Sequence, residues 1–161
     1  MVYYLIIRGP LGCGKSTVAE ALSGILRAKH VAIDNILDEN NIEEWEDGYV
    51  SKKSFIKANE ISVEGVMETL KKETSVIFDG NFYFKEQIED LIKRLKSPHY
   101  VFTFKAPLDV CIARDSKRVT SFGKDAAKAV YRKVAEFDYG INIDVTKPID
   151  ETIEEILSYL P

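Results

Sequence analysis

The chain has 161 residues, of which 45% are hydrophobic and 30% are charged, and its net charge is −4. These values predict one globular domain, residues 1–161, that is large enough to bury a core. The acidic balance disfavours general binding to nucleic acid. No apolar run approaches membrane-spanning length, and the N-terminus lacks the charged region and cleavage site of a signal peptide. The two cysteines, Cys13 and Cys111, indicate neither a disulfide framework nor a metal framework, so we expect a protein of the reducing cytoplasm.

The first predicted strand, residues 2–7, is an apolar run that leads directly into the stretch GPLGCGKST. This stretch fits the pattern G-x-x-x-x-G-K-[ST] of a phosphate-binding loop (P-loop). A helix is predicted from residue 15 to residue 29, since apolar side chains recur there at helical spacing. A glycine-rich loop between a strand and a helix can point its N–H groups inward as a nest for a polyphosphate. The helix dipole adds to that attraction.

Within this loop, Lys15 is expected to reach the β- and γ-phosphates, and the Ser16 hydroxyl to bind Mg²⁺. Cys13 is interpreted as a small loop residue rather than a reactive thiol. The alternative, a glycine-rich turn with a surface lysine, does not explain the flanking strand and helix. The loop residues predicted to hold the nucleotide are Gly9, Leu11, Gly12, Cys13, Gly14, Lys15, Ser16 and Thr17.

A second short strand, residues 30–33, is predicted to end at Asp34. Ligands of open α/β sheets bind beyond the carboxyl ends of the strands, so Asp34 is expected at the rim of the site. It is a candidate for binding a substrate hydroxyl or for acting as general base, and the alternative is a helix N-cap. His30 stands at the start of the second predicted strand and His99 just before the fourth, so we interpret both as surface residues on the opposite rim.

Residues 38–47 carry six carboxylates and no basic side chain, which is typical of a solvated, mobile surface. Trp45 lies in this run, either as a stacking platform for substrate or as an anchor to the core, and we favour the anchor. A long helix is predicted over residues 51–72. Its Asn59 and Glu60 are candidates for contact with a substrate, but helical spacing does not decide whether they face the site.

The third predicted strand, residues 74–78, ends in Asp79. A carboxylate after such a strand is expected to hold Mg²⁺ in P-loop enzymes. It also has the chemistry to activate the attacking hydroxyl, and the alternative is a simple Asp-Gly turn.

After a predicted helix over residues 85–96 and a strand over 100–104, a helix from Pro107 carries Arg114 and Arg118 four residues apart, on one face. Two guanidiniums over a phosphate site suit the charge on a transferring phosphoryl group, whereas the alternative is a solvated basic helix end. A further helix is predicted from residue 124 to Gly140. Its Arg132 either swings toward the phosphates or belongs to a solvated basic stripe.

The last predicted elements are a strand over residues 141–145 and a helix capped by Asp150. The loop between them, residues 146–148, lies at the predicted active rim, where a nucleotide base has room to rest. Strands and helices thus alternate along the whole chain, which favours an α/β fold with a parallel sheet.

The chain resembles the small P-loop kinases of the nucleoside-monophosphate-kinase type, a group that includes adenylate, shikimate and gluconate kinases. The resemblance rests on GPLGCGKST, IDNIL, VIFDGN, APLDVCIARDSKR and INIDVTKPIDETIEEIL. It implies a P-loop NTPase three-layer sandwich, with a five-stranded parallel sheet in the order 2-3-1-4-5 and a helical lid over about residues 114–125. It also implies an acceptor-binding insertion over about residues 35–72, and transfer of the ATP γ-phosphoryl group.

The resemblance also implies roles for single residues. The residue at Asp34 contacts the acceptor and often acts as base. The residue at Arg114 stacks on adenine, and the one at Arg118 contacts the phosphates. Lys147 belongs to the loop that packs against the base.

Two departures from adenylate kinases narrow the acceptor. Those enzymes carry an arginine where this chain has Leu37, and the sequence DGFPR where this chain has DGNFY. Because those arginines grip the acceptor's phosphate, a neutral or weakly polar hydroxyl compound is favoured over an anion. The sequence therefore predicts an ATP- and Mg²⁺-dependent phosphotransferase in which Lys15, Asp34, Arg114 and Arg118 are catalytic and Ser16 and Asp79 bind the metal. The alternatives are a mononucleotide kinase with an atypical acceptor site and a nucleotide-dependent switch without an acceptor.

Overall fold

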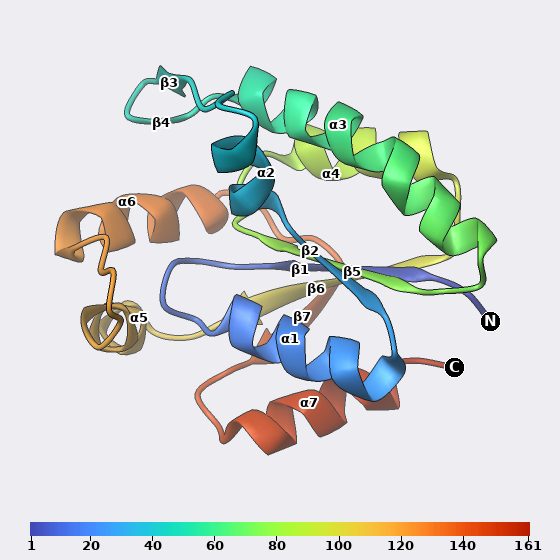
Figure 1. Ribbon diagram of the computed structural model, residues 1–161. Helices are drawn as coiled ribbons and strands as arrows, with labels where there is room; N and C mark the ends of the chain where they lie inside the picture. The colour runs from blue at the N-terminus through green and yellow to red at the C-terminus, as the bar shows by residue number, and fades with distance from the viewer.

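The computed structural model describes all residues 1–161. One parallel sheet of five strands runs through its middle in the order β2-β5-β1-β6-β7 (Figure 1). This is the predicted order 2-3-1-4-5, because the third and fourth strands in the chain form a separate hairpin. The strands of the main sheet are β1 (Tyr4–Arg8), β2 (Lys29–Ala32), β5 (Val76–Gly80), β6 (His99–Lys105) and β7 (Ile141–Asp144).

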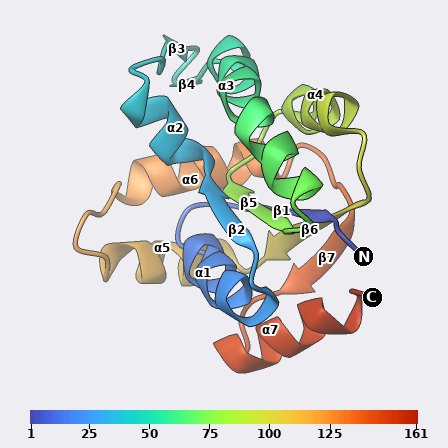
Figure 2. The ribbon, with the colours of Figure 1, turned by 45° about the vertical axis from the view of Figure 1, so that its right-hand side comes forward.

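Helices cover both faces of the sheet, as a three-layer sandwich requires. Two helices, α1 and α7, lie on one face, and α3, α4 and α6 lie on the other (Figures 1 and 2). None of them combines the length and the apolar composition that crossing a bilayer requires. The helices are α1 (Lys15–Leu26), α2 (Ile33–Glu39), α3 (Lys52–Lys71), α4 (Lys85–Leu95), α5 (Leu108–Ser116), α6 (Lys124–Val134) and α7 (Ile149–Ser158).

The central strand β1 separates two hydrophobic cores. All its residues are buried, and successive side chains point to opposite faces. Leu5 and Ile7 pack in the core shared with α1 and α7. Tyr4 and Ile6 pack in the core shared with α3 and α4. The strand that precedes the P-loop is therefore held rigidly from both sides.

Arg8, the last residue of β1, is 0% exposed. It donates to the carbonyls of Phe82 (3.2 Å) and Val134 (3.0 Å) and to the hydroxyl of Thr103 (3.2 Å). Its guanidinium also lies 4.2 Å from the centre of the Phe137 ring. Arg8 thus joins the strand before the P-loop to the C-terminal end of α6, a role that the sequence did not suggest.

Several element boundaries differ from the predicted ones. Helix α6 ends at Val134 and does not continue to Gly140. Gly140 instead allows close packing on β6, since a Cβ there would lie 2.1 Å from the carbonyl oxygen of Val101. Asp150 lies in the first turn of α7, whose N-cap residue is Pro148.

The acidic run contains a β-hairpin, whereas its charge pattern predicted a mobile surface. Strands β3 (Trp45–Glu46) and β4 (Tyr49–Val50) pair antiparallel across the turn residues Asp47 (φ 54°) and Gly48 (φ 82°). Two central residues with positive φ are the requirement of a tight hairpin turn, for which Asp-Gly is a preferred pair. The Ser51 hydroxyl then caps α3 by accepting from the backbone N–H of Ser54.

Candidate active site

The P-loop follows β1 and curls over the start of α1. Gly12 and Gly14 adopt φ values of 76° and 84°, which residues other than glycine rarely adopt. A Cβ on Gly12 would also lie 2.2 Å from the carbonyl oxygen of Cys111. The Lys15 ammonium donates to the carbonyl of Pro10 over 2.7 Å, so it lies across its own loop. The loop therefore has the backbone geometry that a phosphate nest needs.

The P-loop and the predicted lid arginines line one hollow of about 290 Å³, the phosphate hollow. Arg114 lies in the last turn of α5, and Arg118 follows the end of that helix. The hollow contains three basic side chains, so it suits a polyanion. The residues that line it are Gly12, Gly14, Lys15, Ser16, Thr17, Arg114 and Arg118.

Asp79 lies beside the P-loop, as predicted, within the C-terminal part of β5. Its Oδ1 accepts a hydrogen bond from the Ser16 hydroxyl over 3.0 Å, and its side chain is almost fully buried. The other carboxylate oxygen contacts Nε2 of His30. That hydrogen bond raises the pKa of His30, against the effect of partial burial.

The interpretation of His30 as a surface residue on the opposite rim is therefore wrong. Strand β2 begins at Lys29, one residue earlier than predicted, so His30 is the second residue of the strand and not its first. In the sheet register His30 lies opposite Ile77, and Ile77 and Asp79 point to the same face of β5. Alternation along the strand was the signal that would have found this contact. His99 is exposed, as predicted, and stacks on the Tyr4 ring.

Ser16 and Asp79 together fit a magnesium ion. No cluster of three or more His, Cys, Asp and Glu side chains is arranged to hold a metal. Magnesium bound with a nucleotide does not need such a cluster, because phosphates and water supply most of its ligands and the protein adds one or two oxygens. The hydroxyl of Ser16 and the carboxylate of Asp79, 3.0 Å apart, are oxygen donors of that kind.

Asp34 is the second residue of α2 and lines a cavity of about 190 Å³ next to the P-loop. The N-cap of α2 is Ala32, so the alternative role of Asp34 as a helix cap is wrong. Desolvation by the surrounding protein raises the pKa of the Asp34 carboxyl, and the nearby charge of Lys15 opposes this shift. Asp34 is thus a carboxylate within the field of the P-loop lysine and open to a separate cavity.

Aromatic side chains from distant parts of the chain line this cavity, and no pattern in the sequence predicted that they lie together. Trp45 is 66% exposed and its Nε1 donates to Glu43 over 2.9 Å, so the favoured role as a core anchor is wrong. Phe122 comes from the predicted lid, and Tyr49 and Tyr83 lie deeper. The Asp47-Gly48 turn was the signal for the hairpin that carries Trp45 and Tyr49.

Other predicted residues lie away from this cavity and from the phosphate hollow. Asn59 is buried and donates to the carbonyl of Gln87 and to Asp90, so it does not face a substrate. Glu60 is a surface residue that pairs with Lys57. Arg132 is exposed and lines neither the cavity next to Asp34 nor the phosphate hollow. Lys147 forms an ion pair with Glu155 of α7.

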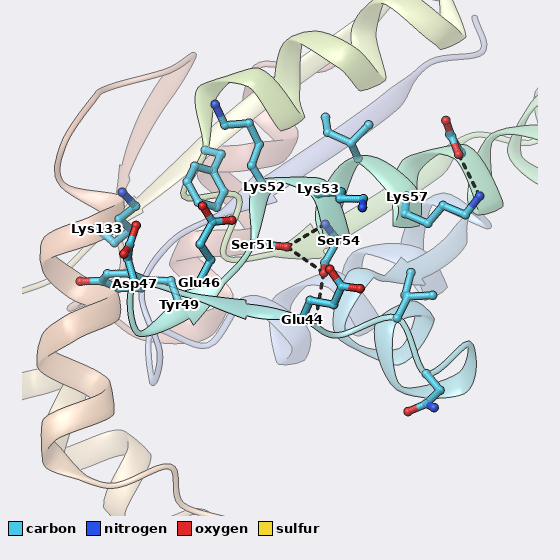
Figure 3. A pocket seen from close by; sticks show the side chains of 15 residues that line it. Glu44, Glu46, Asp47, Tyr49, Ser51, Lys52, Lys53, Ser54, Lys57 and Lys133 are labelled. Atoms are coloured by element: carbon cyan, nitrogen blue, oxygen red, sulfur yellow. Dashed lines mark hydrogen bonds and ion pairs between the residues drawn. The ribbon is translucent and has the colours of Figure 1, made fainter.

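A larger hollow of about 820 Å³ lies against the other face of the hairpin (Figure 3). Glu44 and Glu46 line it, whereas Glu43 and Trp45 line the smaller cavity, as the alternation along a strand requires. Most of its lysines already have acidic partners: Lys52 pairs with Glu86, Lys57 with Glu60 and Lys133 with Glu136. None of the residues predicted to be catalytic reaches this hollow.

Comparison with known proteins agrees with this geometry. Residues 5–138 match the family model described as AAA domain, and the chain belongs to that family. No match is found among curated proteins. A solved sugar kinase from Janibacter sp. HTCC2649 is 18% identical with a TM-score of 0.81, over 99% of this chain and 95% of that one. A solved gluconokinase from Sinorhizobium meliloti 1021 is 15% identical with a TM-score of 0.74, over 96% and 89%. The predicted P-loop kinase fold is therefore confirmed.

Proposed function

We propose that the chain is a kinase that transfers the γ-phosphoryl group of ATP to a hydroxyl of a small molecule, with Mg²⁺ as cofactor. One observation carries this proposal: Asp34 lies within the field of Lys15 and also lines a separate cavity. A nucleotide-dependent switch needs the phosphate hollow but has no use for an acceptor cavity beside it. The names of the structural neighbours, a sugar kinase and a gluconokinase, also favour a hydroxyl acceptor.

Each site residue then has a role in positioning or in charge neutralisation, which together account for most of the catalysis of phosphoryl transfer. Lys15 and the loop N–H groups hold the phosphates, and Arg114 and Arg118 close over the transferring group. Ser16 and Asp79 would hold Mg²⁺, which neutralises charge on the phosphate oxygens when bound. Asp34 orients the acceptor hydroxyl and accepts its proton, and its raised pKa improves it as a base.

The base of the nucleotide has a candidate location beside the P-loop. A hollow of about 570 Å³ extends from Pro10 to Thr146 and is lined by Phe104, Pro107 and Tyr131 among others. An apolar hollow of this kind suits a purine ring. Lys147 belongs to the same loop as Thr146, and its contact with the nucleotide stays a prediction. A cytoplasmic location also stays a prediction, which the two free, buried cysteines favour.

The mononucleotide kinase is the weaker alternative. An acceptor phosphate requires basic side chains to hold it. The cavity next to Asp34 has no lysine, arginine or histidine among its lining residues. We therefore favour an acceptor without a phosphate.

The test is ADP release from ATP in the presence of separate panels of sugars, other alcohols, nucleosides and nucleoside monophosphates. Stimulation by an alcohol or sugar panel, and loss of turnover in Lys15→Ala, is the expected result. Lys53→Ala, a change at an exposed lysine outside the phosphate hollow, is the matched control and should retain activity. Slow ADP release that no panel stimulates would favour the switch, and near-normal turnover in Lys15→Ala would overturn the mechanism.

A further inference from the structure

The cavity beside Asp34 is apolar in most of its lining. Eleven of its sixteen lining residues are hydrophobic. Its volume of about 190 Å³ lies below the roughly 300 Å³ at which typical ligand pockets begin, so it suits a small molecule. Phe55, Leu37 and Val130 are among the aliphatic and aromatic side chains that line it. A ligand that fits this cavity therefore presents an apolar body.

The charged groups of the cavity are all carboxylates: Asp34, Asp38 and Glu43. Asp34 and Asp38 are four residues apart on α2 and so lie on one face. The charges of Asp38 and Glu43 both raise the pKa of Asp34. Neither Asp38 nor Glu43 belongs to any ion pair of the structure. Glu43 accepts a hydrogen bond from Nε1 of Trp45, so the negative charge on this wall has a polar partner but no cationic partner from the protein.

The hydroxyls of the cavity are already engaged. Tyr49 donates to the carbonyl of Ala129 and Tyr83 donates to the carbonyl of Val50, each over 3.3 Å. These tyrosines therefore present only their rings to a ligand. Asn81 is the one side-chain amide among the lining residues. A polyol such as a sugar needs many donors and acceptors, and this cavity offers chiefly acceptors, on its carboxylates. The ligand must supply the donors.

Two exposed aromatic side chains from distant parts of the chain complete the wall. Trp45 of the hairpin is 66% exposed and Phe122 of the lid is 55% exposed. Both line the same cavity, so together they form an exposed apolar surface of the kind that marks a ligand site. An aromatic ring can stack on both, and a nearby cation is attracted to the face of an indole.

We propose that the acceptor is a small amino alcohol with an apolar, aromatic body, an inference that rests on the proposed kinase function. Its hydroxyl lies at Asp34, its ammonium group is held by Asp38 and Glu43, and its apolar body packs between Trp45 and Phe122. In the reaction the hydroxyl oxygen forms a bond to the γ-phosphorus, and the bond from that phosphorus to the bridging oxygen of ADP breaks. Asp34 takes the hydroxyl proton and passes it to solvent, and the products are ADP and a phosphate monoester.

Binding can be measured without turnover, because Trp45 is the only tryptophan in the chain and its fluorescence reports on this cavity. Three probes share a phenyl ring and a hydroxyl and differ in charge: 2-amino-1-phenylethanol, 1-phenyl-1,2-ethanediol and mandelate. Titrations with ADP present should give the lowest Kd for the amine, an intermediate Kd for the diol and the highest for mandelate. One charge-assisted hydrogen bond corresponds to a difference of about tenfold between amine and diol.

Variants test the source of the preference. The double change Asp38→Asn with Glu43→Gln should reduce the preference for the amine over the diol to about twofold or less. Glu46→Gln, a matched change on the other face of the hairpin, should retain the full preference. An equal or higher affinity of the wild-type protein for mandelate, or an unchanged preference in the double variant, overturns the proposal.

Two further outcomes separate this inference from the kinase function. If ADP release is stimulated by gluconate or another anionic alcohol while the amine leaves Trp45 fluorescence unchanged, the kinase function stands and the amino alcohol is wrong. If the amine binds in the expected order but no alcohol stimulates ADP release, the kinase function is wrong and the ligand preference of the cavity stands.

Discussion

The hydroxyl of Ser16 donates a hydrogen bond to Oδ1 of Asp79 over 3.0 Å, although 63 positions separate the two residues in the chain. The contact brings the first turn of α1 against the carboxyl end of β5. It pairs a neutral oxygen donor with a carboxylate next to the phosphate hollow, the arrangement expected of a site for nucleotide-bound Mg²⁺. His30 contacts the other oxygen of the same carboxylate and so helps to fix its orientation.

Asp79→Asn should raise the Mg²⁺ concentration needed for half-maximal ADP release by at least about tenfold, because an amide is a weaker ligand for a hard cation. The measurement is a magnesium titration at saturating ATP. Asp138→Asn is the matched control, since Asp138 is an exposed carboxylate that pairs with Lys105. An unchanged magnesium requirement in Asp79→Asn would remove this residue from the metal site.

Asp34→Asn should lower kcat by at least about a hundredfold and still allow ATP to bind, because the acceptor hydroxyl loses its base. For the wild-type enzyme, kcat/KM should rise with pH through a pKa above 3.8, the ordinary value for aspartate, since desolvation raises the pKa of Asp34. The measurements are a pH–rate profile and direct binding of ATP. Loss of ATP binding in Asp34→Asn would instead assign Asp34 to the nucleotide site.

The same pKa shift has a consequence for stability. A carboxyl whose pKa is raised in the folded state contributes stability below its unfolded pKa, and that contribution is lost as pH rises through the folded pKa. Ionised Asp34 therefore destabilises the protein at pH 7, and Asp34→Asn should melt at a higher temperature there. The gap between the two melting temperatures should narrow as pH falls through the raised pKa of Asp34 toward 3.8, the ordinary value for aspartate. A lower melting temperature for Asp34→Asn at pH 7 would contradict this account.

Arg114→Ala and Arg118→Ala should affect different kinetic constants. If Arg114 stacks on the base, its loss raises KM for ATP more than it lowers kcat. If Arg118 contacts the transferring group, its loss lowers kcat by about a hundredfold, which is typical of a missing transition-state donor. Lys117→Ala, between the two, is the control, since Lys117 is exposed and does not line the phosphate hollow. Equal effects of all three changes would indicate a general loss of positive charge.

Local patterns in the sequence predicted those parts of the site that lie at the end of a single strand or at the start of the helix that follows it. The P-loop, Ser16 and Asp79 follow from strand-to-helix order, since the carboxyl ends of parallel strands meet at one edge. His30 was missed because its contact depends on the register between β2 and β5, and a shift of one residue decides which face a side chain occupies. The aromatic wall was missed because Trp45 lies in the hairpin and Phe122 lies between α5 and α6, and only the fold brings both to one cavity. The spacing of residues within one segment does not show which distant segment will pack beside it.

Arg8 is a further residue whose role depends on distant parts of the chain, and Arg8→Lys should destabilise the protein by about 2–4 kcal/mol. Lysine has no planar fork, so it leaves some of the buried acceptors at Phe82, Thr103 and Val134 without a donor. The measurement is the free energy of unfolding in urea at pH 7, where Arg8 is charged because burial lowers its pKa only to about 10. Arg132→Lys is the matched control in α6 and should change stability little, since Arg132 is exposed. Equal stability of wild type and Arg8→Lys would show that the buried guanidinium is not what holds α6 to the strand before the P-loop.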